Sequence, residues 1–186
     1  MRCGSVLSMS VKRDPGVVTF LKSVPIFIDL TGPRLDNLID FLEEQTWAPG
    51  DRVFSEGEFG RAMYVIRDGE IEVARKSTRG NLVPIVRLGP GDTFGEMSLI
   101  ERQPRSATCV VKKKTTTYVL TNVDLWNLYK SDHTAYIIIL QNICHMLSRR
   151  LRKADSRIVE FLDMLDEAGV AKKEEGAAKA RRKKRT

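Results

Sequence analysis

The sequence is poor in the residues that metal centres and disulfide frameworks require. Among its 186 residues are two histidines, His133 and His145, and three cysteines, Cys3, Cys109 and Cys144. A metal-centred β-barrel needs several His and carboxylate ligands that converge from neighbouring strands, whereas both histidines fall in or beside a stretch with helical spacing. We therefore expect no metal ion. Because the cysteines are odd in number and far apart, we interpret them as reduced thiols.

Long apolar runs are also absent. The longest, residues 135–140, is far shorter than the roughly 20 residues of a membrane-spanning helix, and the N-terminus lacks the apolar core of a signal peptide. These features favour a cytoplasmic protein. Also missing are a Gly-x-Ser-x-Gly elbow, a GxxxxGKS/T loop and a cysteine with a suitably spaced histidine. Because no catalytic constellation is found, we predict that the protein is not an enzyme.

Basic residues concentrate at the C-terminal end. The chain has 31 Lys and Arg against 24 Asp and Glu, and residues 171–186 hold eight of these cations and two of the anions. The remaining residues are nearly neutral, with 23 cations and 22 anions. No large apolar residue follows Val170, so we expect residues 169–186 to form a basic disordered tail. Such a tail either stays solvated or binds nucleic acid or an acidic partner weakly and without specificity.

The hydrophobic pattern changes twice along the rest of the chain. Residues 1–18 are predicted to be a flexible N-terminus and residues 19–168 a folded domain. Within that domain, residues 19–44 have helical spacing. Residues 47–121 are short β-branched and aromatic runs with turn signals every 8 to 15 residues, which is typical of an antiparallel barrel or sandwich. The sequence therefore predicts a mainly β fold with helices before and after it.

Local signals also predict one hairpin turn and the bounds of one helix. Asp68-Gly69 stands between two alternating runs, and glycine supplies the positive φ of a type I′ turn, so we predict a hairpin there. From about Asp132 one long helix is expected to run to Ala168, because Gly169 is a typical C-terminal stop.

Residues 94–108, FGEMSLIERQPRSAT, have the composition of an anion site. Gly95 lets the backbone approach a ligand, and residues 97–101 are long enough for a short helix whose free N–H groups can face a phosphate. Arg105 can bind two phosphate oxygens at once and stays charged at any accessible pH. Together these features predict a cradle for a phosphate.

Other residues of the same stretch suit a sugar phosphate. Glu96 accepts hydrogen bonds only, so it suits a sugar hydroxyl rather than a phosphate. The small Ser106 and Ala107 let their backbone amides come near the phosphate. The pair of acid and cation matches a ribose cyclic phosphate. The alternative, a plain surface salt bridge between Glu96 and Arg105, leaves Gly95 and the two small residues unexplained.

FGEMSL followed by RSA closely resembles the phosphate-binding cassette of the cyclic nucleotide-binding domain family, which includes catabolite activator protein and protein kinase A regulatory subunits. Upstream, PGDRVFSEGEFGRAMYVIRDGEIEV carries the family's glycines at Gly57, Gly60 and Gly69. The resemblance spans about residues 20–155. It implies an eight-stranded β jelly roll flanked by helices. Two positions depart from the family pattern, Phe54 and Cys109, and we interpret both as core substitutions that put no ligand contact in doubt.

The resemblance implies a ligand, cAMP or cGMP, and a set of residues that bind it. Glu96 is expected on the ribose 2′-hydroxyl and Arg105 on the cyclic phosphate. The last helix is expected to close over the base, where Arg152 can stack on a purine and Asp155 can accept from guanine. Alternatively, both are solvated helix charges. The residues do not decide between adenine and guanine, and cAMP is favoured because the family uses it widely. The full predicted ligand-binding set is Phe94, Gly95, Glu96, Met97, Ser98, Arg105, Ser106, Ala107, Arg152 and Asp155.

The long helix also carries a heptad pattern. An a/d seam of this kind predicts a homodimer formed through the helix, although its first turns can instead pack on the chain's own barrel. This resembles catabolite activator protein, except that we expect no helix-turn-helix domain after the helix. We expect a stand-alone cyclic nucleotide receptor that signals by rearranging this helix; the alternative is a DNA-associated regulator that uses its basic tail. The two heptad series are Leu140, Leu147, Ala154, Phe161 and Ala168, and Cys144, Leu151, Ile158 and Leu165.

Overall fold

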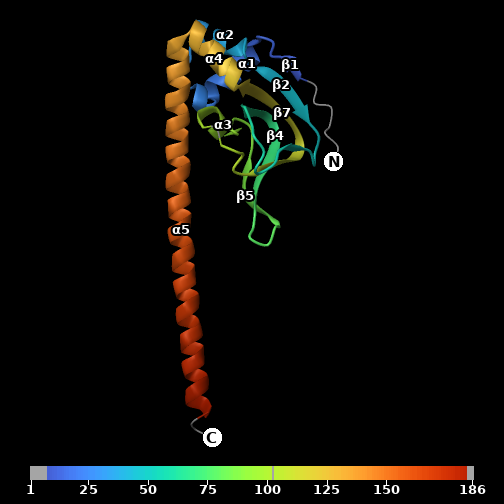
Figure 1. The fold of residues 1–186 in the computed structure, drawn as a ribbon. Helices are drawn as coiled ribbons and strands as arrows, with labels where there is room; N and C mark the ends of the chain where they lie inside the picture. Colours follow the sequence, from blue (N-terminus) through green and yellow to red (C-terminus); the bar gives the residue numbers. More distant parts are fainter. Residues whose placement is uncertain (1–7, 102, 184–186) are drawn as a thin grey trace. The chain divides into compact units, whose positions relative to one another are not determined.

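The computed structural model describes residues 8–101 and 103–183, with side chains for those before residue 168. Two compact units are present, of which the first ends at Ile143 and the second begins at Cys144. The first unit holds the sheet, the short helices and the first turns of the last helix, and the second is the remainder of that helix (Figure 1).

The N-terminal region contains a short strand and three short helices. Asp14 caps the first helix, because its carboxylate accepts a hydrogen bond from the Val17 N–H at 2.9 Å. Val17 is also buried. Residues 1–18, predicted to be flexible, thus include a strand and the start of a capped helix. The four elements are β1 (Ser8–Ser10), α1 (Pro15–Ser23), the 3-10 helix η1 (Pro25–Phe27) and α2 (Pro33–Ile39).

The sheet is antiparallel, as predicted, and its strand order is β1-β2-β7-β4-β5. Two short strands lie off this path, β3 on β7 and β6 on β4. The described residues form seven strands rather than the eight that the family resemblance implied, and this sheet does not close into a ring. The remaining strands are β2 (Glu43–Trp47), β3 (Arg52–Phe54), β4 (Ala62–Lys76), β5 (Leu82–Leu88), β6 (Thr93–Phe94) and β7 (Thr108–Thr121).

The prediction of a hairpin at Asp68-Gly69 was wrong. β4 continues through both residues, and its register against β7 shifts on each side of Asp68. Gly69 has φ of +100°, and a Cβ there would lie 2.3 Å from the Thr115 hydroxyl oxygen. A β-bulge and a type I′ turn both use a glycine with positive φ. The long β7, which pairs with β4 on both sides of the bulge, decides between them.

The long C-terminal helix begins as predicted but ends later, and a shorter helix precedes it. α4 (Asn122–Ser131) starts with a capping box of Thr121 and Asp124, and α5 (His133–Lys183) follows one residue after Asp132. The predicted stop at Gly169 was wrong, because α5 continues through it. One glycine costs a helix only about 1 kcal/mol, and the alanine, lysine, glutamate and arginine residues after it are strong helix formers.

In the region of the predicted basic tail, the backbone of residues 169–183 continues α5 as a helix rather than as a disordered segment, and the binding of this region to nucleic acid or an acidic partner stays a prediction. Its side chains are not described, and residues 184–186 are not described at all. No helix among the described residues has both the length and the hydropathy needed to cross a membrane.

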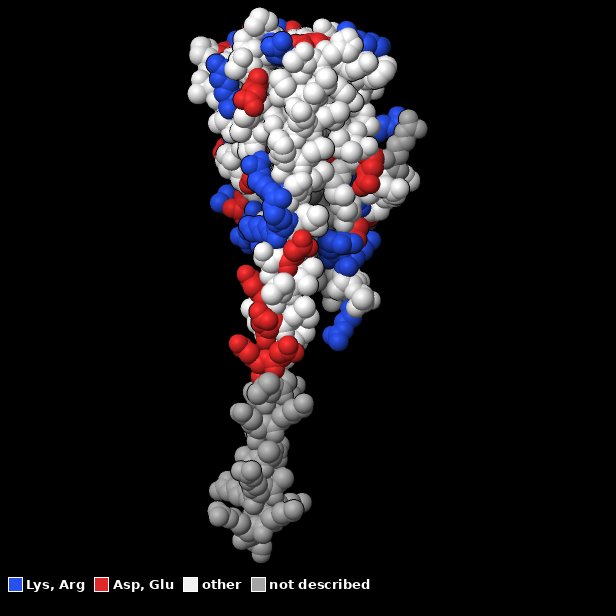
Figure 2. Space-filling view, turned by 90° about the vertical axis from the view of Figure 1, so that its left-hand side faces the viewer, with Lys and Arg blue, Asp and Glu red and all other residues white. Residues whose placement is uncertain are grey.

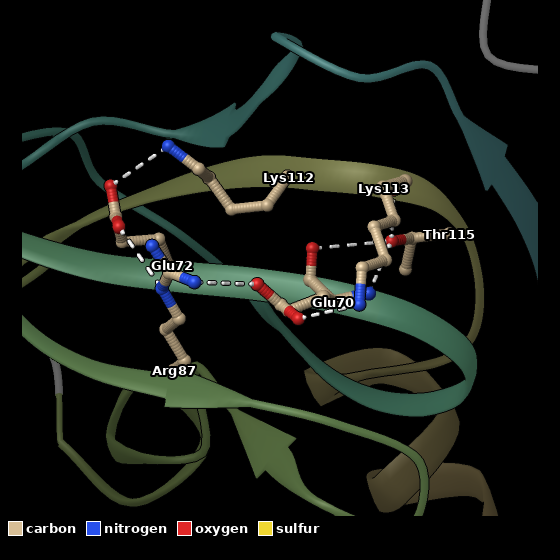
Figure 3. A network of polar contacts seen from close by, with 6 residues as sticks. All are labelled: Glu70, Glu72, Arg87, Lys112, Lys113 and Thr115. Atoms are coloured by element: carbon tan, nitrogen blue, oxygen red, sulfur yellow. Dashed lines mark hydrogen bonds and ion pairs between the residues drawn. The ribbon is translucent and has the colours of Figure 1, made fainter.

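A charged network covers part of the outer face of the sheet (Figure 3). Glu70 on β4 lies 2.9 Å from the Lys113 ammonium on β7 and 3.4 Å from the Arg87 guanidinium on β5. Glu72 reaches the same Arg87 at 3.5 Å and Lys112 at 3.3 Å. Because the partners come from three neighbouring strands, the network supports their register through cross-strand pairs.

Glu70→Gln should reduce the dependence of stability on acid pH. The hydrogen bond from Lys113 holds the pKa of Glu70 below its ordinary value of 4.5. Its stabilising effect is therefore complete above the unfolded pKa and is lost as pH falls through the lower folded-state pKa. Urea unfolding at pH 7 and pH 3 should show a larger difference between wild type and variant at pH 7. The exposed Glu160→Gln serves as the control, and equal differences at both pH values for Glu70→Gln would contradict the assignment.

Candidate functional site

The candidate site is built on the connection between β6 and β7. Gly95 follows β6 with φ of +77°, which favours glycine. The predicted short helix is present as α3 (Met97–Ile100). The chain then leads to Arg105, whose backbone N–H donates to the Glu58 carbonyl oxygen at 2.8 Å and whose carbonyl accepts from the Gly57 N–H at 2.9 Å. The loop before β4 and the segment before β7 are thus joined at Arg105.

The Arg105 side chain is buried, with 6% of the residue exposed, and three oxygen atoms hold it. One terminal nitrogen, Nη1, donates to the Gly95 carbonyl and to the Ser98 hydroxyl, both at 2.9 Å. The other, Nη2, donates to the Ala62 carbonyl at 2.8 Å. All three acceptors are uncharged. The guanidinium is therefore fixed in position while its charge is not neutralised by these bonds.

This cation has no charged hydrogen-bond partner. In the described part of the chain Arg105 has no ion pair, and its Nε atom is buried without a hydrogen-bond partner. Burial lowers the pKa of Arg105 because the charged form loses hydration. Burying a charge is expensive unless it is paired. The site therefore has the properties of a receptor for an anion.

Two further residues confine the guanidinium. The Phe54 ring centroid lies 4.0 Å from the guanidinium carbon, Cζ. At Gly60 a Cβ would lie 2.1 Å from Nε, so no larger residue fits without moving Arg105. The interpretation of Phe54 as a core substitution that puts no ligand contact in doubt was thus incomplete, because its ring contacts the predicted phosphate-binding residue.

Known proteins identify the domain that carries this site. Residues 44–132 match the family model described as "Cyclic nucleotide-binding domain", and this range contains Gly60, Gly95 and Arg105. Residues 44–132 therefore belong to the cyclic nucleotide-binding domain family.

Several relatives carry the domain within longer proteins. A "Cyclic AMP receptor protein" of Thermus thermophilus is 30% identical over 139 residues, which is 73% of this chain and 61% of the relative. A "cAMP-dependent protein kinase regulatory subunit" of Yarrowia lipolytica is 42% identical over 51% of this chain and 24% of its own length. A "cGMP-dependent protein kinase" of Plasmodium berghei is 28% identical over 80% of this chain and 16% of its own. The chain thus spans less than two thirds of each relative.

A solved structure agrees with the fold. The crystal structure of Thermus thermophilus catabolite activator protein has a TM-score of 0.66 at 30% identity, covering 76% of this chain and 63% of that one. The likeness supports the jelly-roll class predicted for this cyclic nucleotide-binding domain, together with its flanking helices and long C-terminal helix.

The predicted cassette residues gather around Arg105 to different degrees. Gly95 and Ser98 bind it directly. Glu96 is buried, with 3% exposed, immediately before α3. Phe94 belongs to the core, where its ring stacks on Tyr64 with centroids 5.0 Å apart.

The remaining predicted residues are more accessible. Met97 and Ser106 are exposed, with the Ser106 hydroxyl 3.8 Å from the Met97 sulfur, and Ala107 is half-buried. Arg152 and Asp155 are exposed on the part of α5 that forms the second unit. Their role at the base stays a prediction.

Sequence reasoning missed the partners at the start of β4 and on the loop before it. Ala62 and Glu58 contribute only carbonyl oxygens, which any residue has, so no sequence signal marks them. Gly60 was recognised as a family glycine, but only the structure shows that Arg105 occupies the space of its missing side chain.

A cysteine, Cys109, lies near Arg105. Cys109 is buried as predicted, and burial raises its pKa to about 12, so the thiol stays protonated and weakly nucleophilic at neutral pH. Among residues 8–101 and 103–183 no three His, Cys, Asp or Glu side chains come together in a way that could hold a metal ion.

Proposed function

We propose that this domain is a receptor for a cyclic nucleotide, with Arg105 on the cyclic phosphate. The observation that carries the proposal is the buried guanidinium with uncharged hydrogen-bond partners. Arginine has five N–H groups, and three are used within the protein. The Nε–H and one Nη2–H remain for an anion. A monoanionic cyclic phosphate would neutralise the charge and accept these two bonds.

Glu96 complements this arrangement. Its buried position directly before α3 and its electrostatic attraction to Arg105 support a carboxylate near the cation. A carboxylate repels a phosphate but accepts hydrogen bonds from hydroxyls. We therefore assign the ribose 2′-hydroxyl to Glu96. The relatives named for cAMP and cGMP support both bases, and we propose cAMP as the preferred ligand.

Calorimetry with cAMP, cGMP and adenosine tests the proposal on the wild-type chain. Losing the charged partner of a desolvated ion pair costs about 2 to 5 kcal/mol. Adenosine should therefore bind at least roughly 30-fold more weakly than cAMP. Absence of binding by both cyclic nucleotides would overturn the proposed function. Binding of adenosine as tightly as cAMP would overturn the role of Arg105.

We further propose that the output uses α5 as a dimer seam. Apolar seam residues of α5 are exposed, including Leu151 at 63%, Ile158 at 58% and Phe161 at 60%. Charged side chains flank this seam, changing from Lys and Arg to Asp and Glu toward residue 167 (Figure 2). An exposed apolar stripe with a heptad period is typical of a helix that pairs with another. A second copy of the chain supplies such a helix.

Charged residues in the seam should produce a monomer. In the double variant Ile158→Glu and Leu165→Glu, like charges would face each other across a dimer, so sedimentation velocity should show a monomer where wild type is a dimer at tens of micromolar. Ser156→Glu, off the seam, is the control and should stay dimeric. If ligand strengthens the dimer, the dimer must bind ligand more tightly, typically by about 1 to 3 kcal/mol. A wild-type chain that stays monomeric with and without ligand would refute the seam.

A further inference from the structure

Phe54 is the aromatic residue nearest to the charge of Arg105. It ends β3 and is paired in register with Cys109 on β7. Its ring centroid lies 4.0 Å from the guanidinium carbon, whereas that of Tyr64 lies 6.0 Å away. Cation–π attraction acts within about 6 Å of a ring centroid, so Phe54 lies well inside this range and Tyr64 at its limit.

The Phe54 ring is itself held in place. It packs against Tyr64 with centroids 6.0 Å apart and against Phe94 at 5.8 Å, both in tilted arrangements. Tyr64 and Phe94 are in turn stacked on each other at 5.0 Å. The three rings form one aromatic cluster, continuous with the core around Trp47 and Cys109. The contacts with Tyr64 and Phe94 therefore restrict the conformation of the Phe54 side chain.

The ring supplies a restraint that the hydrogen bonds do not. The bonds to Gly95, Ser98 and Ala62 lie along the N–H directions and hold the guanidinium mainly within its plane. Contact with an aromatic ring opposes tilting out of that plane and keeps water away from the cation. A leucine at this position would lack the negative face of the ring and would leave space beside the guanidinium.

We propose that Phe54 is a positioning residue that sets the affinity of this chain for the phosphate, acting through Arg105. This inference rests on the proposed function, because the affinity concerned is that for a cyclic nucleotide. Phe54 orients the unused Nε–H and Nη2–H groups before the ligand arrives, so less freedom is lost on binding. The aromatic ring at position 54 is thus part of the anion site, not only of the core.

A double-mutant cycle between Phe54→Leu and Arg105→Lys tests this, with Phe54→Tyr as the conservative variant. Phe59→Leu, the same change at an exposed residue of the neighbouring loop, is the control. Calorimetry with cAMP should show about a tenfold loss for Phe54→Leu, within the range of cation–π contacts. The loss should shrink to less than about twofold in the Arg105→Lys background. Phe54→Tyr should bind nearly as wild type does, and Phe59→Leu should be unchanged.

The outcomes separate this inference from the proposed function. Suppose that wild type binds cAMP. If Phe54→Leu then binds as tightly as wild type, or if Phe54→Leu lowers affinity as much in the Arg105→Lys background as in wild type, the positioning role is wrong and the proposed function stands. If wild type binds neither cAMP nor cGMP, the proposed function is wrong. The cycle is then measured by urea unfolding of the ligand-free proteins: coupling between the two positions supports the restraint on Arg105, and strictly additive effects overturn it.

Discussion

Arg105→Ala should weaken cyclic nucleotide binding by roughly 30-fold to several thousand-fold. The variant removes the cation and leaves the Ser98 hydroxyl and two carbonyl oxygens without their donor. Arg105→Lys should also lose affinity, because an ammonium cannot reproduce the planar set of donors that contacts three protein oxygens and a phosphate together.

Calorimetry checks both variants, and Arg61→Ala is the matched control. Arg61 is an exposed arginine on the loop before β4, which Arg105 contacts through other residues, so its removal should leave affinity unchanged. Far-UV circular dichroism and urea unfolding establish that each variant is folded before its affinity is compared. Near-normal affinity in both Arg105 variants would remove Arg105 from the site.

Gly60→Ala should damage binding almost as strongly while leaving the fold intact. A Cβ at this position would lie 2.1 Å from the Arg105 Nε and 2.3 Å from its Cζ, so the guanidinium must move. The obstacle is the end of a side chain rather than backbone, so the fold can adapt. Moving the guanidinium breaks hydrogen bonds to a charged group, each worth about 1.5 to 3 kcal/mol. Loss of one or two such bonds from the binding geometry predicts a roughly tenfold to several hundredfold decrease in affinity.

Gly89→Ala is the control for this effect. A Cβ at Gly89 would meet no atom within 4 Å, so the same substitution there should change neither affinity nor the unfolding midpoint. Gly95→Ala is a poorer test, because its positive φ adds backbone strain to the contact with Arg105. Normal cAMP affinity in Gly60→Ala would show that Arg105 can bind the phosphate from another position.

Local signals predicted much of the fold because they depend on neighbours in sequence. Within residues 19–44, where helical spacing was predicted, Leu35, Leu38 and Ile39 lie on α2 and are buried, and α3 stands where the cassette pattern placed it. The prediction of a hairpin at Asp68-Gly69 was wrong because a hairpin and a bulge need the same glycine conformation, and only pairing with the distant β7 distinguishes them. The prediction of a helix end at Gly169 was wrong because helix formers on both sides outweigh one unfavourable residue.

The sequence by itself determined the antiparallel β class, the resemblance to the cassette and the prediction that Arg105 binds the anion. These follow from residue types and short spacings. Only the tertiary structure decided how Arg105 is held: by the Ala62 carbonyl, by the ring of Phe54 and by the space at Gly60, which lie between 43 and 51 positions away along the chain. Carbonyl acceptors and close approaches depend on which distant segments the sheet brings together, and no local pattern encodes them.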